Sequence, residues 1–360
     1  MLPTDADDQH PLTEIKVGSD GLLKLISTSG SDEFICQVAR HTSGAKGIKL
    51  PPDDRALIRY LFRNGHTTPL EFAEACFFWR LPMDAWRQGV RHRTASINEY
   101  STRYREAIDE CNQLRPDEWR LQSKTNRQGS SGVLVESVDP STGWPAGYEL
   151  KPVRDGDQTV QMRFPPDGKG NPHVYPCELT PGAYLTERQE KLQEHARQVY
   201  NERLEFGVAF EVARTDLPLS TYTELFWKCD MNNILRFLSL RMHSHAQKEI
   251  REYADAMYAM LKPRFPFTIE AFDDFDHRRG AVILSRLDIE VIRGMLGQLV
   301  PDPDHPDWSS LWGGGHKQWN DHEQWLKEQG RKNTTVGERV ECLAKLKRLG
   351  LVPEKTDLSS

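Results

Sequence analysis

The stretch from residue 91 to residue 104 constrains the fold most, because it is rich in charge and poor in apolar side chains. Between Arg87 and Arg105 the sequence has five arginines and one histidine but a single acid, Glu99. Guanidinium groups bind phosphate or carboxylate through paired, charge-assisted hydrogen bonds. With so few apolar residues, this stretch is predicted to lie at a surface or a ligand site. A solvated basic loop is the simpler alternative.

The composition narrows the classes of protein that the chain can belong to. Its 360 residues are 38% hydrophobic and 28% charged, which is typical of one large globular domain or two. The net charge of −6 argues against a general nucleic-acid-binding surface, so the arginine cluster favours a small anionic ligand. No apolar run is long enough to span a bilayer, and residues 1–30 lack the apolar centre of a signal peptide. We therefore expect a cytoplasmic protein without a membrane partner.

Metal and disulfide chemistry find little support in the sequence. The six cysteines are scattered and contain no Cys-x-x-Cys pair, which gives no sign of a disulfide framework or a zinc site. The two histidines of His243-Ser244-His245 lack a nearby acid or cysteine partner, so no metal site is predicted.

Several elements are predicted before the arginine-rich stretch. Residues 1–30 are polar and are expected to form a loosely held lead-in. A strand is expected over 33–40 and a helix from residue 51 to Gly65. The segment from Thr68 to Glu71 fits a capping box with proline at the first helical position, a helix start that is structural more often than functional. A buried strand over 75–81 and a short helix over 83–91 then lead into the stretch.

The rest of the chain is predicted to be mainly helical. Residues 123–180 form a β-rich insertion of alternating strands and turns, with strands expected over 133–138, 148–153 and 159–164. A helix is predicted over 185–206. A second has a buried stripe of Ile234, Leu235, Leu238 and Met242, with Asn232 and Arg236 sharing one side. Two more are expected over 284–299 and 335–349, in an extension that we interpret as a packing or oligomer-contact appendage, with a binding module as the alternative.

The arginine-rich stretch has a specific spacing, Arg-His-Arg-x-x-Ser-x-Asn-x-x-Ser-x-Arg-Tyr. This pattern resembles the signature of the flavin-dependent thymidylate synthases. Three other segments are similar to segments of that family: His-x-Thr-Pro-x-Glu at 66–71, Val-Ala-Arg-x-x-Leu-Pro at 212–218 and Phe-Leu-x-Leu-Arg at 237–241. The resemblance covers about residues 30–265 apart from the insertion.

The resemblance implies a reaction and an architecture. The chain would methylate deoxyuridine monophosphate (dUMP) to thymidine monophosphate (dTMP), with carbon from 5,10-methylenetetrahydrofolate and reducing equivalents from NADPH through FAD. It implies a mixed α/β fold whose central sheet is flanked by long helices. It also implies a homotetramer with sites built from several subunits. The chain would then divide into the lead-in at 1–30, a catalytic domain at 31–270 and a helical extension at 271–360.

The resemblance also assigns residues. The positions that match dUMP contacts are Gln88, Arg91, Glu99, Ser101, Thr102, Arg103, Arg214 and Arg241. The positions that match FAD contacts are His66, Thr68, Arg91, His92, Arg93, Glu99, Asp230, Asn232 and Arg236. Arg241 is the match for the catalytic arginine that contacts the pyrimidine and assists ionisation at its N3. Asn232 and Arg236 stand where some members have Arg and Asn.

Two other hypotheses remain at this point. A nucleotide- or RNA-binding protein could use the arginine cluster without catalysis, and it would need an extended basic face with exposed aromatic side chains. A catalytically idle member of the family could serve assembly through its extension. Flavin binding separates the first alternative from an enzyme, and turnover separates the second.

Overall fold

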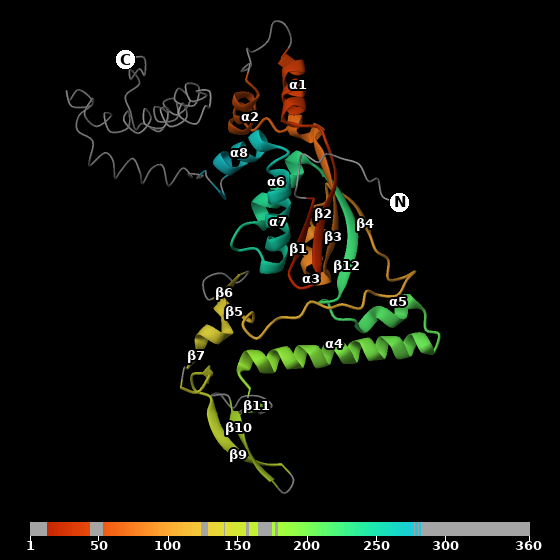
Figure 1. Cartoon of the computed structure of the whole chain (residues 1–360), viewed down its shortest axis with the longest axis vertical. Coiled ribbons are helices and arrows are strands. Elements are labelled where there is room, and N and C mark those ends of the chain that lie inside the picture. Colours follow the sequence, from red (N-terminus) through yellow and green to blue (C-terminus); the bar gives the residue numbers. More distant parts are fainter. Residues whose placement is uncertain are drawn as a thin grey trace, which may run out of the picture.

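The computed structural model describes residues 13–43, 53–123, 129–139, 141–155, 158–164, 175–176, 179–276, 278–279 and 281. Its centre is a five-stranded antiparallel sheet in the order β1-β2-β3-β12-β4 (Figure 1). The strands are β1 (Glu14–Val17), β2 (Gly21–Ser29), β3 (Glu74–Pro82), β12 (Tyr222–Asp230) and β4 (Ser96–Glu99). The prediction of a mixed fold with a central sheet is confirmed.

Strands β3 and β12 are the longest pair at the centre of the sheet. They pair over their whole length, from Tyr222 opposite Pro82 to Asp230 opposite Glu74. Alternate residues of both strands point into one core. The largest are Phe77 and Trp79 of β3 and Trp227 of β12, and the Trp79 ring stacks on Tyr253 at 5.6 Å between centroids. The sheet therefore presents one apolar face to the helices.

The described helices are α1 (Asp32–Ser43), α2 (Asp54–Arg63), α3 (Met83–Gly89), α4 (Pro181–Glu205), α5 (Phe210–Ala213), α6 (Met231–Arg241), α7 (Lys248–Leu261) and α8 (Pro266–Phe275). Helices α6 and α7 cover the apolar face of the sheet, and α8 packs against α2 (Figure 1). Burial of this face is the main stabilising contribution to the fold. Among the helices of the described residues, none combines the length and apolar character that crossing a membrane requires.

Three small sheets lie in the β-rich insertion and the segment just before it. They pair β5 (Arg120–Gln122) with β6 (Ser130–Val133), β7 (Val138–Asp139) with β8 (Trp144–Pro145), and β9 (Glu149–Asp155) with β10 (Gln158–Phe164) and β11 (Tyr175–Pro176). The β9–β10 hairpin extends beyond α4, away from the central sheet (Figure 1). Strands were correctly predicted near 148–153 and 159–164. The strand predicted over 133–138 is wrong, because a 3₁₀ helix (Leu134–Ser137) interrupts it.

Two predictions near the N-terminus are wrong. Residues 33–40 are not a strand but lie in α1, where Ile35, Cys36 and Ala39 are buried at helical spacing. The lead-in is not loosely held over 14–29, because β1 and β2 pair with each other and β2 pairs with β3. Burial of the alternate leucines Leu23 and Leu25 explains why this polar segment joins the sheet.

The predicted start of a helix at Thr68 also needs correction. A 3₁₀ helix runs over Thr68–Phe72, its N-cap is Thr67, and no side chain caps it. The helix predicted over 83–91 ends at Gly89, and the one predicted from residue 185 begins at Pro181, where the Thr180 hydroxyl accepts the Ala183 amide. The helices predicted over 284–299 and 335–349 lie outside the described residues.

Candidate active site

Arg241 joins the two arginine-containing clusters of the sequence. It ends α6, and its guanidinium reaches the last turn of α3 and the residues that follow it. There Nη2 donates to the Gln88 backbone oxygen at 2.9 Å and Nη1 donates to Gln88 Oε1 at 3.3 Å. Nε donates to His92 Nε2 at 3.2 Å. Three predicted site residues that lie up to 153 positions apart are therefore in direct contact.

His92 accepts this bond because its ring is held neutral. The imidazole is half-buried and packs edge-on against Phe237, with 4.9 Å between ring centroids. Burial lowers the pKa of His92 to about 4, with smaller contributions from the charges of Arg241 and Arg236. Burial and the charge of Arg91 likewise lower the pKa of Arg241. The excess of positive charge makes the site favourable for an anionic ligand.

Glu99 is held at the edge of the sheet. Strand β4 pairs with β12, so that Glu99 lies opposite Leu225. Its carboxylate accepts the indole N–H of Trp86 and the hydroxyl of Thr223, each at 2.9 Å. The carboxylate is thus fixed in direction while the residue itself remains exposed.

The second end of the motif lies against α5 and the 3₁₀ turn Arg214–Asp216. Arg214 Nη1 donates to the Thr102 hydroxyl at 2.6 Å, and Arg103 forms an ion pair with Glu211 at 3.1 Å. The Ser101 hydroxyl accepts the Arg103 amide at 3.4 Å. Apart from Glu99, the predicted nucleotide residues therefore fall into two groups, one around Arg241 and one around Arg214.

A cavity of about 460 Å³ lies on the other side of α6. It contains three predicted FAD residues, His66, Asn232 and Arg236. It is lined by Leu61, Phe62, His66, Thr67, Leu70, Asn232, Leu235, Arg236, Ser239, Leu240, Phe272, Phe275, Asp276 and Arg278. The walls thus combine apolar side chains with two arginines and an amide. This donor set fits a flavin nucleotide, whose rings need apolar contacts and whose phosphates need cations.

The remaining predicted FAD residues have different surroundings. Asp230 caps α6, because its carboxylate accepts the Asn233 amide at 3.0 Å. Thr68 is exposed beside Thr67, which lines the cavity. Arg91 and Arg93 are exposed on either side of His92. Glu71, a residue that the sequence analysis did not assign, accepts a hydrogen bond from Asn232 at 3.3 Å.

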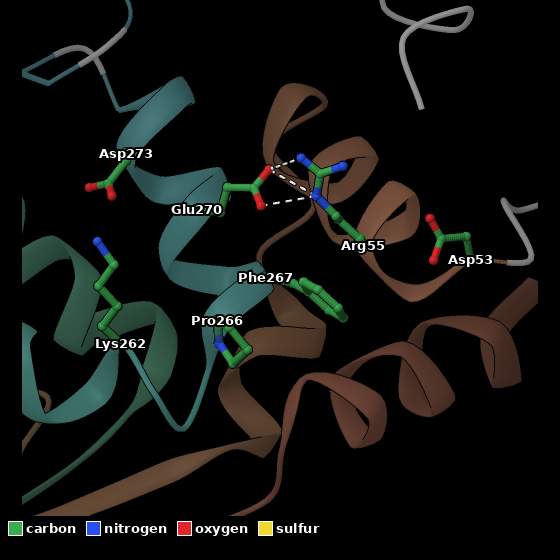
Figure 2. A pocket seen from close by; sticks show the side chains of 7 residues that line it. All are labelled: Asp53, Arg55, Lys262, Pro266, Phe267, Glu270 and Asp273. Carbon is green, nitrogen blue, oxygen red and sulfur yellow. Dashed lines mark hydrogen bonds and ion pairs between the residues drawn. The ribbon is translucent and has the colours of Figure 1, made fainter. Parts of the chain in front are cut away.

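A larger cavity of about 550 Å³ lies between α2 and α8 and contains none of the predicted site residues (Figure 2). In Figure 2 the Arg55 guanidinium faces Glu270, with Nε at 2.9 Å from Oε2. Asp53, Lys262 and Asp273 add charges of both signs around it. Because the Arg55 guanidinium is already paired with Glu270 of α8, we assign this cavity to the packing of α2 on α8.

Some residues around the site were missed by the sequence analysis. Asp84 and Gln247 contact Gln88 directly or through one another, and Trp86 and Thr223 hold Glu99. No local pattern marks these residues, because each acts through a contact made only in the folded chain. Within the described part of the chain, no group of three His, Cys, Asp or Glu residues is arranged to hold a metal ion.

Known proteins are similar to this chain over most of its length. The family model described as "Thymidylate synthase complementing protein" matches residues 24–267. The chain is 36% identical over 288 residues to the flavin-dependent thymidylate synthase of Dictyostelium discoideum, covering 78% of this chain and 80% of that one. It is 34% identical over 309 residues to an enzyme of the same name from Thermus thermophilus, covering 86% of this chain and 94% of that one.

A solved structure is also similar. The UMP/dUMP methylase PolB from Streptomyces cacaoi, bound with 5-Br dUMP, superposes with a TM-score of 0.54 at 27% identity. The match covers 73% of this chain and 98% of that one.

Proposed function

The chain belongs to the flavin-dependent thymidylate synthase family, and from this premise we propose which of its residues bind nucleotide and which bind flavin. The enzyme converts dUMP to dTMP, taking carbon from 5,10-methylenetetrahydrofolate and reducing equivalents from NADPH through FAD. Bound FAD supplies the redox chemistry, and the protein binds, orients and electrostatically stabilises the reactants.

We assign the pyrimidine to the group around Arg241. The single observation that carries this assignment is that Arg241 contacts Gln88 and His92 in a partly buried, positively charged position. A fixed guanidinium there would donate hydrogen bonds to the base and stabilise negative charge that develops on it. Because His92 is neutral, the positive charge at this position belongs to Arg241. Arg91 and Glu99 would complete the contacts to the same nucleotide.

We assign the phosphate of dUMP to the second group. Arg103 and Arg214 offer guanidinium forks, and Ser101 and Thr102 offer hydroxyls that suit phosphate oxygens. The flavin would occupy the cavity with His66, Asn232 and Arg236, with Thr68, His92, Arg93 and Asp230 at its borders.

Three of the described cysteines, Cys36, Cys76 and Cys229, are poorly suited to act as a thiolate nucleophile. Burial raises the pKa of Cys36 to about 12 and that of Cys229 to about 11, and it also raises the pKa of Cys76. These thiols stay protonated at neutral pH and are poor nucleophiles.

We propose that the enzyme works as a homotetramer whose sites are shared between subunits. Large apolar side chains are exposed in the motif, along α4 and at the residue that caps α4: Tyr104 is 74% exposed, Leu192 64% and Phe206 87%. Such exposure on α4 and its neighbours favours contact with another copy. We also propose a cytoplasmic location and an appended extension after α8. The catalytic domain, predicted over 31–270 with the 123–180 insertion, we now extend to include β1 and β2 at one end and the whole of α8 at the other, because both belong to the main core.

The direct test is anaerobic. Purified protein is loaded with FAD, NADPH is added with and without dUMP, and the visible absorption of oxidised flavin is followed. We expect bleaching that dUMP accelerates, followed by dTMP formation when methylenetetrahydrofolate is added. Absence of flavin binding would overturn the proposal.

A further inference from the structure

We infer that Asp84 and Gln247 are positioning residues that fix the orientation of the Gln88 amide and thereby hold Arg241 in place. This inference rests on the proposed function, because it concerns the group that we assign to the pyrimidine.

The contacts form a hydrogen-bond relay with a defined direction, which runs through Asp84, Gln247, Gln88 and Arg241. The Asp84 carboxylate accepts a hydrogen bond from Gln247 Nε2 at 3.0 Å. The Gln247 amide thus turns its N–H₂ toward this carboxylate oxygen, which accepts. Gln247 Oε1 is then left to accept from Gln88 Nε2, at 2.6 Å. Gln88 Oε1 in turn faces Arg241 and accepts from Nη1 at 3.3 Å.

This direction matters because the Gln88 amide can rotate. In the opposite orientation its N–H₂ would face the guanidinium of Arg241, and two donors would oppose one another. Arg241 would lose its acceptor on the Gln88 side chain, with only the backbone oxygen of Gln88 and His92 Nε2 remaining. Leaving a partly buried guanidinium N–H without an acceptor costs more than an ordinary hydrogen bond contributes.

The fold holds Asp84 and Gln247 firmly. Asp84 lies in the first turn of α3, and Gln247 stands directly before α7, which packs against α3. The start of α7 is itself fixed by the segment that precedes the insertion. Glu249 pairs with Arg120 at 2.7 Å, and Lys248 pairs with Glu118 at 2.8 Å.

The first test removes the relay without removing bulk. Gln247→Leu takes away both amide contacts, and dUMP affinity is measured on the FAD-loaded enzyme by titration calorimetry. We expect binding to weaken about tenfold, the loss of roughly one charge-assisted hydrogen bond. FAD affinity should stay at the wild-type value.

A matched control variant is available in α4. Gln189 also makes two hydrogen bonds, accepting the Leu114 amide at 3.1 Å and donating to the Asn112 oxygen at 3.0 Å. Gln189→Leu removes the same number of bonds outside the relay. Gln189→Leu should lower the melting temperature by about as much as Gln247→Leu does, and it should leave dUMP affinity unchanged.

The second test exchanges donor and acceptor. Gln247→Glu alone sets two carboxylates against each other and should weaken dUMP binding. Adding Asp84→Asn supplies a donor at position 84, while the carboxylate introduced at position 247 still accepts from Gln88, so the double variant should recover most of the affinity. This rescue also decides the case if Gln247→Leu fails to fold.

Two results would overturn the inference. They are wild-type dUMP affinity in folded Gln247→Leu, and no recovery in a folded double variant. If the wild-type enzyme itself does not bind dUMP, the proposed function fails instead, and the two failures are thereby distinguished.

Discussion

The two ends of the 91–104 motif differ in the surroundings of the side chains that they contribute to the site. At the first end His92 is half-buried, packed on Phe237 and bonded to Arg241. At the second end Arg103 and Glu211 pair with more than half of each side chain exposed. The fold of one chain thus completes the first end and leaves the second open. We take the second end to be completed by another copy of the chain.

The largest effect should follow from a change at the buried end. Arg241→Ala removes the guanidinium assigned to the pyrimidine, and dTMP formation should fall by about 10²–10³-fold. Arg241→Lys keeps the charge but not the planar fork, so it should recover only part of the rate. Steady-state assays of dTMP measure both, and wild-type turnover in folded Arg241→Ala would contradict the comparison.

A change at the open end should affect binding alone. Arg103→Ala removes a proposed phosphate contact, and the Kd for dUMP should rise roughly tenfold. The exposed ion pair with Glu211 contributes little to stability, so the melting temperature should stay within about 2 °C of the wild type. A large loss of stability without loss of dUMP affinity would reverse the assigned roles of the two ends.

The burial of His92 predicts a pH dependence. The unfolded chain binds a proton at His92 near its ordinary pKa of 6.5, whereas the folded chain resists protonation until about pH 4. Protons therefore favour the unfolded state between these values, and stability should fall as the pH is lowered from 6.5 to 4. His92→Gln keeps an acceptor for Arg241 but does not titrate, so thermal melts should show a smaller fall. An equal fall in both proteins would contradict this role of His92.

The smallest effect is expected from Glu211→Gln. It removes the exposed partner of Arg103, which should change the free energy of unfolding by less than about 1 kcal/mol. Because Arg103 is then free to meet a ligand anion, dUMP affinity should stay the same or rise slightly. Chemical denaturation and calorimetry measure the two quantities, and weaker dUMP binding would indicate that Glu211 orients Arg103.

The local sequence pattern was sufficient to predict an element where the spacing of its apolar residues agrees with their burial in the fold. The helical spacing of Leu57, Ile58 and Leu61 correctly predicted α2, and the bulky residues 75–81 correctly predicted β3. The strand predicted over 33–40 was wrong because its apolar residues fit either element. Tertiary packing decides between them, since Asp32 at the start of α1 binds the first amides of α8, with Phe267 N at 2.7 Å.

The residues of the candidate site likewise fall into those that the sequence could indicate and those that only the folded chain brings together. Gln88, His92 and Arg241 could be nominated from the sequence because they match positions of the family, and the structure brings these three residues into contact. Asp84 and Gln247 could not, because they lie 163 positions apart and gain their role only when α3 packs on α7. No sequence window contains both partners of such a contact.

One mixing experiment tests the shared site most directly. Arg241→Ala and Arg103→Ala are each purified, shown to be folded and nearly inactive at low dUMP, and then reassembled together into mixed oligomers. If a site takes Arg241 from one copy and Arg103 from another, some sites in the mixture are intact and dTMP formation recovers. If both arginines come from one copy, every site carries a defect. Activity no higher than the average of the two separate variants would contradict the account.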